Sequence, residues 1–377
     1  MNRLFLLLFL LITFKTQAQS SALKLADSLF AYGNYTKAIK AYKAYNSPKD
    51  VYDKIAKAYM AIGNYDEAIQ NYEAALNANP TDLLVKYEYA KLLSRNKKFN
   101  DANVLFNELI SADNQNPNYY YELGLVLEQQ NDTTAINSYK HAYDLDDTHQ
   151  KAIYKIAKYY LVKRQHDVSL QFVDKGLQSY ANNVELISLK ALNYYWEQDY
   201  RTAAIWFEKL ITLGESSQFI HEKLGFCYAQ HYEYEKAIEQ GIITLKFDPK
   251  NTTNLYILGQ LYQHIQDYPN AEKYILAALE IQNQPLDAEY INLGTTYNRQ
   301  KKYKEAIEAL QIAVKENPSN ETAQFFLVNS KAAYYENIDS KIKVYETFKQ
   351  KFPESPYIFF ADQRLKELND EKFLKHD

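Results

Sequence analysis

Hydrophobic and small residues recur along this chain of 377 residues at intervals of about 34 positions. One series of nine small residues advances in steps of 30 to 35: Ala26, Ala56, Ala90, Gly124, Ala157, Ala191, Gly225, Gly259 and Gly294. A second series follows the first by 11 or 12 residues: Ala38, Ala68, Ala102, Ala135, Ser169, Ala203, Ala237, Ala271 and Ala306. A repeat of this length predicts a stack of similar units, each packed on its neighbours, in place of a single globular core.

Each unit is predicted to be a pair of antiparallel helices. In the eighth unit, Leu255, Leu258 and Gly259 fall on one face of a first helix. Ala271 and Ile275 fall on one face of the second helix. Because two helices approach closely only where small side chains lie at their crossing, we expect Gly259 and Ala271 to mark that crossing.

Proline and glycine predict where second helices end or change. Three prolines that follow second helices should stop them: Pro80, Pro249 and Pro318. The first unit is followed by a short step of 30 residues, so its second helix should end early, near Asn46-Ser47-Pro48. Gly241 lies inside a second helix, where glycine costs roughly 1 kcal/mol relative to alanine. It predicts either close contact with a neighbouring helix or a kink.

The units resemble the tetratricopeptide repeat. That family combines a large residue, Leu, Gly or Ala, and Tyr in the first helix with a Gly/Asp–Tyr turn, Ala, an aromatic residue, Ala and Pro. The second unit carries this pattern as Tyr52, Ile55, Ala56, Tyr59, Gly63, Asn64, Tyr65, Ala68, Tyr72, Ala75 and Pro80. The ninth carries it as Tyr290, Leu293, Gly294, Tyr297, Tyr303, Ala306, Leu310, Ala313 and Pro318. The resemblance covers residues 22–320, with a degenerate tenth unit to about residue 352. It implies an all-α fold, a right-handed superhelical solenoid of antiparallel helix pairs.

The beginning of the chain departs from the repeat. Arg3 precedes an apolar run from Leu4 to Phe14, and small residues stand at and before Ala18. This is the pattern of a secretory signal peptide that is cleaved after residue 18. We therefore expect an exported protein, in the periplasm or associated with the cell surface.

The solenoid is then expected over residues 19–352, and residues 353–377 are expected to form a capping helix and a tail. The helix is predicted from Ile358 to Leu368, with Ala361 and Leu365 among its inward-facing residues. A stack of repeats needs such a cap because its last apolar face would otherwise be exposed. The residues after Leu368 are expected to fray.

Charge and cysteine content exclude several classes of protein. Loss of residues 1–18 removes Arg3 and Lys15 from 43 basic residues and leaves the 47 acidic residues unchanged. No basic stripe suggests a nucleic-acid partner. No later segment is long and apolar enough to span a membrane. Cys227, the single cysteine, cannot form an internal disulfide and is expected to be a small packed residue.

The sequence also lacks several common catalytic motifs. There is no His-Glu-x-x-His, no Gly-x-Ser-x-Gly and no phosphate-binding glycine loop. The seven histidines are scattered, and Asp146 and Asp147 follow a predicted helix, where they favour solubility. We therefore expect no enzymatic activity, no cofactor and no metal site.

The family resemblance implies that the first helices line a concave groove. On that register the groove candidates are Tyr87, Lys91, Tyr121, Tyr154, Lys158, Tyr195, Trp196, Phe226 and Tyr256. Aromatic residues are enriched at binding surfaces. The competing interpretation is compositional, because the chain contains 36 tyrosines and some would occupy these positions by chance. The positions with which the family clamps terminal carboxylates are mostly Tyr, Leu or Phe here, which argues against such a clamp.

These observations predict a non-catalytic scaffold or adaptor of the bacterial cell envelope that holds a protein or peptide partner in its groove. The alternative is a glycan or small-ligand receptor that uses the aromatic residues around Tyr195 and Trp196. A self-associating spacer is a third interpretation. No motif identifies the partner.

Overall fold

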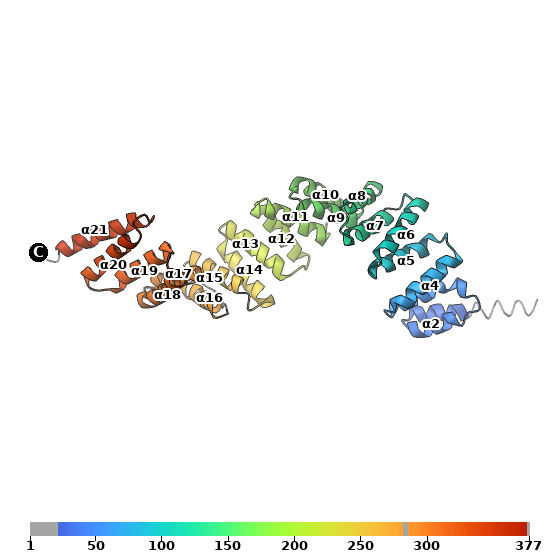
Figure 1. Cartoon of the computed structure of the whole chain (residues 1–377), viewed down its shortest axis with the longest axis horizontal. Helices are drawn as coiled ribbons and strands as arrows, with labels where there is room; N and C mark the ends of the chain where they lie inside the picture. The colour runs from blue at the N-terminus through green and yellow to red at the C-terminus, as the bar shows by residue number, and fades with distance from the viewer. Residues whose placement is uncertain (1–21, 282–285, 375–377) are drawn as a thin grey trace, which may run out of the picture. The chain divides into compact units, whose positions relative to one another are not determined.

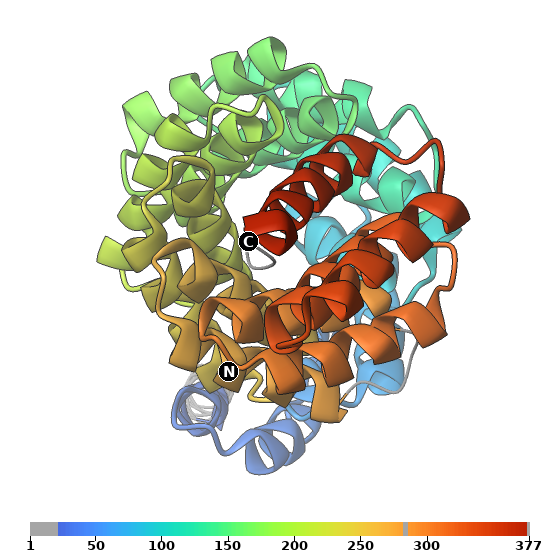
Figure 2. The same ribbon diagram turned by 90° about the vertical axis from the view of Figure 1, so that its left-hand side faces the viewer.

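The computed structural model describes residues 22–281 and 286–374, and every regular element in these ranges is helical (Figure 1). The expected signal peptide, residues 1–18, lies outside the described residues. Within each of two compact units, both views show helices lying beside their neighbours along the chain (Figures 1 and 2), as residue contacts between consecutive helices also show. The expectation of an all-α chain built from packed helix pairs is confirmed.

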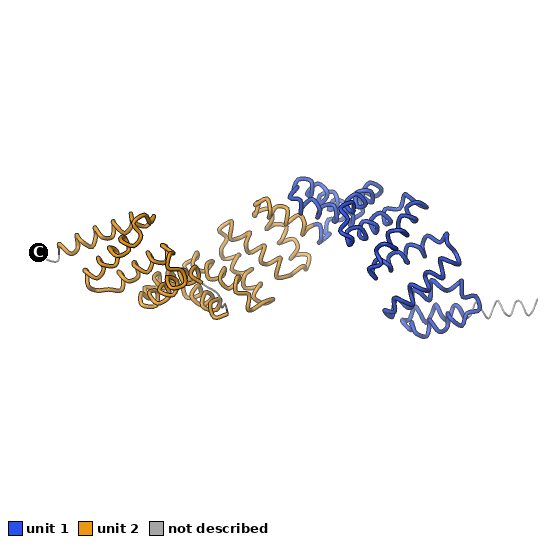
Figure 3. Tube along the Cα trace, in the orientation of Figure 1, with its two compact units in different colours: residues 1–186 blue, residues 187–377 orange. Residues whose placement is uncertain are grey.

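Contacts divide the chain into two compact units, residues 1–186 and 187–377, with the division inside α11 (Val184–Trp196) (Figure 3). Unit 1 contains a helix over residues 22–31 followed by α2 (Tyr35–Lys43), η1 (Pro48–Asp50), α3 (Tyr52–Ala61), α4 (Tyr65–Ala78), α5 (Leu83–Arg95), α6 (Phe99–Ala112), α7 (Pro117–Gln129), α8 (Ala135–Leu145), α9 (Gln150–Val162) and α10 (His166–Ser179). Unit 2 contains α12 (Tyr200–Thr212), α13 (Gln218–Gln230), α14 (Tyr234–Phe247), α15 (Thr252–His264), α16 (Tyr268–Ile281), α17 (Asp287–Arg299), α18 (Tyr303–Glu316), α19 (Glu321–Tyr334), α20 (Ile338–Lys351) and α21 (Ile358–Leu374).

The small residues lie where the two helices of a pair cross. All nine residues of the second small series are buried. A Cβ atom added to Gly259 of α15 would lie 2.5 Å from Cγ1 of Ile275 and 3.3 Å from the carbonyl oxygen of Ala271 in α16. The expected crossing at Gly259 and Ala271 is therefore confirmed. First helices also contact the first helices of neighbouring pairs, as α5 does with α7 and α17 with α19.

A left-handed residue follows the first helix in nine successive pairs, whereas α19, the first helix of the last pair, is followed by Tyr335 in an extended conformation. In the described part of the chain these residues recur at the repeat period: Gly33, Gly63, Lys97, Asn131, Arg164, Gln198, Tyr232, Gln266 and Lys301. The turn is closed behind the left-handed residue by a backbone bond to the helix, as from Asn64 N to the Tyr59 oxygen at 2.9 Å. Glycine adopts this conformation without strain, yet only two of these nine positions, Gly33 and Gly63, are glycine. A third glycine with positive φ, Gly214, follows the second helix α12.

Helix ends follow the predicted stops. α4, α14 and α18 each end two residues before the prolines at 80, 249 and 318. α2 has nine residues and ends before the turn at Pro48, as the short first step predicted. Proline explains these stops because it disfavours a helical conformation in the residue before it.

Gly241 lies within an uninterrupted α14. A Cβ atom at this position would lie 2.7 Å from Cδ2 of Leu258 in α15. The Asn254 side chain donates a hydrogen bond from Nδ2 to the Gly241 carbonyl oxygen at 2.7 Å. Close contact with the neighbouring helix is therefore the reason for this glycine.

The C-terminal helix is longer than predicted. α21 begins at Ile358 as expected but continues to Leu374, because residues 369–374 include no glycine or proline. Lys372 Nζ lies 2.6 Å from Asp339 Oδ1 of α20 and holds the last turn. Ala361 is fully buried, and the Tyr357 ring, just before the helix, stacks on Phe325 with centroids 4.7 Å apart. Residues 369–374 of the expected tail are therefore helical, and Ala361 packs inward. The role of this helix as a cap stays a prediction.

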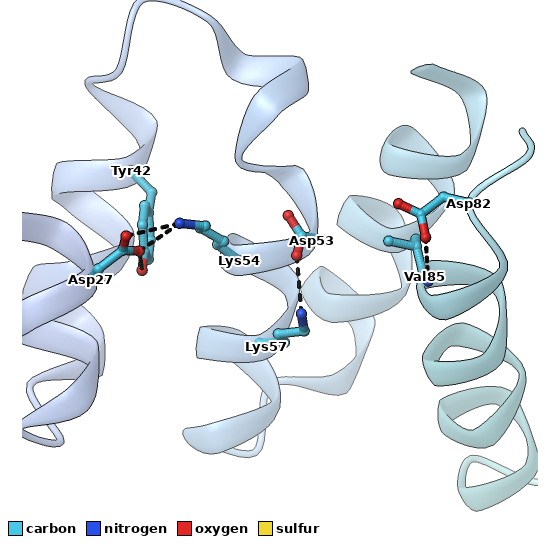
Figure 4. A network of polar contacts seen from close by, with 7 residues as sticks. All are labelled: Asp27, Tyr42, Asp53, Lys54, Lys57, Asp82 and Val85. Carbon is cyan, nitrogen blue, oxygen red and sulfur yellow. Dashed lines mark hydrogen bonds and ion pairs between the residues drawn. The ribbon is translucent and has the colours of Figure 1, made fainter. Parts of the chain in front are cut away.

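A polar network joins the first three helices of unit 1 (Figure 4). Lys54 Nζ of α3 lies 2.8 Å from Asp27 Oδ1 in the helix over residues 22–31. The Tyr42 hydroxyl of α2 donates to the same carboxylate oxygen at 2.7 Å. Further along, the Asp82 carboxylate caps α5 by accepting from Val85 N at 3.0 Å. Side-chain bonds thus supplement the apolar packing between pairs.

Candidate functional site

Five of the predicted groove residues lie on the first helices of unit 1. Tyr87 is half-buried and packs against Tyr119, with ring centroids 5.5 Å apart. Lys91 Nζ lies 4.6 Å from the centre of the Tyr87 ring. Tyr121 packs against the ring of His149 at 5.3 Å. These side chains are therefore largely engaged by their neighbours.

The remaining pair of this group is more open. Tyr154 is half-buried, Lys158 is exposed, and Nζ of Lys158 lies 5.7 Å from the Tyr154 ring centre. Burial raises the pKa of Tyr121 to about 12, so its hydroxyl stays protonated at physiological pH. Together these five residues give the first helices of unit 1 a cationic and aromatic surface.

Three predicted residues come together in unit 2. Tyr195 lies 5.5 Å from both Trp196 and Phe226, measured between ring centroids. Tyr200, at the start of α12, closes the group at 5.3 Å from Phe226. Trp196 and Phe226 keep 47% and 40% of their surfaces exposed, so the cluster offers an open aromatic face. The last candidate, Tyr256, lies further along α15, and its hydroxyl accepts a hydrogen bond from Asn292.

A cavity of about 640 Å³ adjoins this cluster, between α13 and α15. We call it the α13–α15 pocket. Its lining includes Tyr195, Phe226, Tyr234, Ile257 and His264. Gly225 and Gly241 also line it, and their lack of side chains leaves room between the helices. A concave site that combines aromatic walls with polar side chains can hold a ligand.

Polar side chains surround the aromatic part of the pocket. Lys223 Nζ lies 4.4 Å from the Tyr195 ring centre and 3.3 Å from its hydroxyl oxygen. The Glu222 carboxylate accepts from Asn251 Nδ2 at 3.1 Å. Gln230 and Gln260 belong to the same lining. The pocket therefore presents a cation, a carboxylate and two amides next to its aromatic wall.

Two histidines occupy different environments here. His221 is 4% exposed, with Nδ1 2.7 Å from Gln240 Oε1 and Nε2 2.9 Å from Ser216 Oγ. Both ring nitrogens are therefore occupied by hydrogen bonds that hold the helices together. His264 is exposed and stacks flat on Tyr234, with centroids 4.6 Å apart. The first is structural, and the second forms part of the wall.

Metal ligation and thiol chemistry each require particular side chains in suitable surroundings. Among the described residues, no group of three or more His, Cys, Asp and Glu side chains is placed to hold a metal ion. Cys227 is fully buried, and burial raises the pKa of its thiol to about 12, so it is no nucleophile at neutral pH. Over the same ranges, no helix combines the length and apolar character that a membrane span requires.

Sequence reasoning missed part of this site. Neither Tyr234 nor His264 is among the groove residues predicted from the repeat. His264 ends α15 and Tyr234 begins α14, so only the packing of the two helix pairs brings their rings together. The predicted groove positions stop before the last turn of each first helix. If they had included the last turn, His264 at the end of α15 would have been among them.

Comparison with known proteins finds the same repeat in three places. Models of the tetratricopeptide repeat match residues 59–123, 253–285 and 288–320. A TPR repeat-containing protein of Methanocaldococcus jannaschii is 28% identical over 152 residues, which are 37% of this chain and 27% of the relative. BBSome complex member BBS4 of Bos taurus is 25% identical over 181 residues, 48% of this chain and 34% of the relative. The chain spans about a third or less of the length of these relatives.

Solved structures of other proteins also match parts of this chain. YrrB, described as a TPR protein with an unusual peptide-binding site, is 17% identical, with a TM-score of 0.47 over 50% of this chain and 97% of that one. Yeast Tom70 is 15% identical, with a TM-score of 0.36 over 96% of this chain and 97% of that one. Identity this low concerns the arrangement of helices and not what either protein binds.

Proposed function

Because the chain is a tetratricopeptide repeat protein, we propose that it is a non-catalytic scaffold or adaptor that holds a peptide segment of a partner protein in the α13–α15 pocket. The observation that supports this most directly is the convergence of Tyr195, Phe226 and Tyr234, from three helices, on one cavity of about 640 Å³. Repeat stacks of this kind present extended surfaces for binding.

The energetics of the pocket favour an apolar or aromatic side chain of the partner. Trp196 and Phe226 are each about half exposed, so a partner can cover them without first opening the fold. Full burial of an aromatic side chain contributes about 1.5–3 kcal/mol. Lys223 and the amides of Gln230 and Gln260 can then bond the partner's backbone or polar groups.

Capture of partners from cell extract by the immobilised chain tests this proposal. Phe226→Ala combined with Trp196→Ala should reduce capture of the wild-type partner by about tenfold or more, because hot-spot aromatics cost about 2 kcal/mol or more when truncated. Tyr32→Ala is the matched control, since Tyr32 is an exposed aromatic residue of unit 1 outside the pocket. Equal capture by all three proteins would refute the pocket as the binding site.

We also propose that the protein acts outside the cytoplasm, in the bacterial periplasm or at the cell surface. The signal-like pattern of residues 1–18 supports this location. Fractionation of the source cells, followed by N-terminal sequencing, should recover a chain that begins at Gln19 in the envelope fraction. Recovery of the uncleaved chain in the cytosol would overturn the proposed location without affecting the pocket.

A glycan or small-ligand receptor is the second candidate function. It is favoured by the polar side chains beside the aromatic wall, because sugar rings stack on aromatic faces while their hydroxyls need hydrogen-bond partners. Glu222, Lys223 and Gln230 supply such partners at the same pocket. Glycan-array binding that is lost in Phe226→Ala would favour this candidate, and an array without hits would exclude the glycans it contains.

A further inference from the structure

Charge is divided unevenly between the helices of unit 1. The first helices α3, α5, α7 and α9 carry eight lysine or arginine residues and four acidic residues, a net charge of +4. The second helices α4, α6, α8 and α10 carry two lysines and eight acidic residues, a net charge of −6. The corresponding first helices of unit 2, α13, α15, α17 and α19, carry three basic and four acidic residues, a net charge of −1. The net positive charge is therefore found on the first helices of unit 1. We call this surface, formed by α3, α5, α7 and α9, the first-helix face.

The cations of this face gather around one carboxylate. Glu122 of α7 is half-buried, and burial is the main reason that its pKa is raised. Lys91 and Arg95 of α5 and Lys151 of α9 are close enough to oppose that shift. The Tyr87 hydroxyl also bonds to this carboxylate. Three positive side chains from two helices thus flank α7.

Local ion pairs neutralise five of the eight positive charges on this face, and the other three remain available to a partner. Four of its lysines are paired with carboxylates at 2.7 to 3.0 Å on neighbouring helices or in their own: Lys54, Lys57, Lys86 and Lys155. Lys91 is paired with Glu88 at 3.0 Å. The exposed side chains of Arg95, Lys151 and Lys158 have no carboxylate within ion-pair distance among the described residues. These three cations can therefore be used by a partner.

We propose that the first-helix face of unit 1, around Arg95, Lys151 and Lys158, binds an acidic segment of a partner polypeptide. It is a second binding surface, separate in sequence and residues from the α13–α15 pocket. The net negative charge of the second helices α4, α6, α8 and α10 repels the same segment, so the charge pattern directs it to the first-helix side of these pairs. The second helix before them, α2, is basic. Because the cations lie on α5 and α9 with α7 between them, an extended segment with several acidic side chains fits better than a single anion.

The observations favour a polypeptide over a nucleic acid. A single strand would need accessible aromatic faces for base stacking and a dense row of cations along its phosphates. Here Tyr87 and Tyr121 pack against neighbouring rings, and only three cations are unpaired. Acidic side chains spaced along a peptide match this sparser pattern.

Fluorescence anisotropy with the whole chain tests the proposal. The probe is a labelled peptide of about twelve residues that repeats Glu-Gly-Leu and ends in an amide, so that only side-chain carboxylates can bind. Its affinity should fall about tenfold or more in Arg95→Glu combined with Lys151→Glu. It should also weaken as sodium chloride rises from about 50 to about 500 mM, because exposed charges are screened.

The matched control is Lys37→Glu combined with Lys40→Glu. These two lysines are exposed on α2, a second helix, and their reversal changes the net charge by the same amount. This control should bind the peptide like the wild type. Circular dichroism spectra that coincide for all three proteins would show that the variants are folded.

Several results would overturn the proposal. One is a loss of peptide affinity in the Lys37 and Lys40 control equal to that in the Arg95 and Lys151 variant. Another is wild-type binding of a peptide with Gln in place of Glu that is as tight as binding of the Glu peptide. Tighter binding of an oligothymidylate of about twenty nucleotides would assign the face to nucleic acid instead. Salt-sensitive self-association in light scattering, lost in the Arg95 and Lys151 variant, together with no peptide binding, would assign it to a second copy. Partner capture through Phe226 would stand in each case, so failure here is distinguishable from failure of the pocket.

Discussion

Single residues in this protein are selected by how closely two helices approach. Position 259 requires glycine, because Ile275 and the Ala271 carbonyl already occupy the space that a Cβ atom would need. Gly225 occupies the equivalent position of another pair with more room, since an added Cβ would lie 3.2 Å from Cβ of Gln240 and 3.5 Å from the Ala237 oxygen. The same repeat position therefore tolerates different side chains.

Gly259→Ala should destabilise the protein, whereas Gly225→Ala should be close to neutral. Overpacking costs about 1–3 kcal/mol, and the better helix propensity of alanine returns about 1 kcal/mol. At Gly259 the close contact makes the cost of overpacking larger than the gain in helix propensity. At Gly225 the cost and the gain nearly cancel. Thermal unfolding followed by circular dichroism compares them. Equal melting temperatures for the two variants would contradict this account.

Two buried tyrosines should respond in opposite ways to loss of the hydroxyl. Tyr72 is fully buried, and its hydroxyl has no hydrogen-bond partner among the described residues. Tyr72→Phe should therefore stabilise by about 1 kcal/mol, the lower part of the cost of an unsatisfied buried group. The Tyr139 hydroxyl donates to Glu128 Oε2 at 2.5 Å, so Tyr139→Phe should cost about 1.5–3 kcal/mol. Urea unfolding of both variants measures the sign, and the same sign for both would refute the assignment.

At the scale of elements, helix pairs are joined by side chains as well as by apolar contact. The network of Asp27, Tyr42 and Lys54 links three helices at the start of unit 1 (Figure 4). Burial disfavours the Asp27 carboxylate, but its hydrogen bonds from Lys54 and Tyr42 outweigh burial and lower its pKa. Ionised Asp27 therefore contributes stability above the unfolded pKa of about 3.9, and this contribution is lost as pH falls below that value.

Asp27→Asn should lower the melting temperature at pH 7 by more than it does in strong acid at about pH 2, because the contribution of the ionised carboxylate is lost as pH falls through its lowered pKa. Because the Asp27 side chain is 45% exposed, the effect should stay below about 1 kcal/mol after screening by solvent. Asp53→Asn is the charge-matched control, since its pair with Lys57 lies within α3 and joins no other helix. A gap between wild type and Asp27→Asn that persists unchanged in acid would contradict the assigned role.

At the scale of the whole molecule, stability should be local because each helix pair contacts mainly its neighbours. Phe106 is fully buried in unit 1, and Cys227 is fully buried in unit 2. Phe106→Ala should cost about 3–5 kcal/mol and melt helices near α6 first. The Cys227 thiol, whose pKa burial raises to about 12, reports opening of unit 2 through its reaction with a thiol reagent.

The expected result is an earlier loss of part of the helical signal in Phe106→Ala, with the reaction rate of Cys227 unchanged at the same temperature. A parallel rise in thiol reactivity would show that the chain unfolds as one cooperative body and would contradict a nearest-neighbour stack.

The candidate site was only partly predictable from the residues. The repeat register placed Tyr195, Trp196 and Phe226 on first helices, and packing brings all three together. The same register also selected Tyr87 and Tyr121, which pack against neighbouring rings. Register specifies the direction of a side chain from its helix, whereas exposure depends on which residues of the next pair lie opposite.

The sequence by itself determined the helix pairs, because small residues, turns and stops recur in phase and each acts locally. The tertiary structure decided which positions become a pocket, since Tyr234 and His264 stack only after two pairs have packed. It likewise decided that Gly241 marks a close contact, through Leu258 of the following helix. Local pattern governs what a helix can bury, and only the distances between helices determine what remains open for a partner.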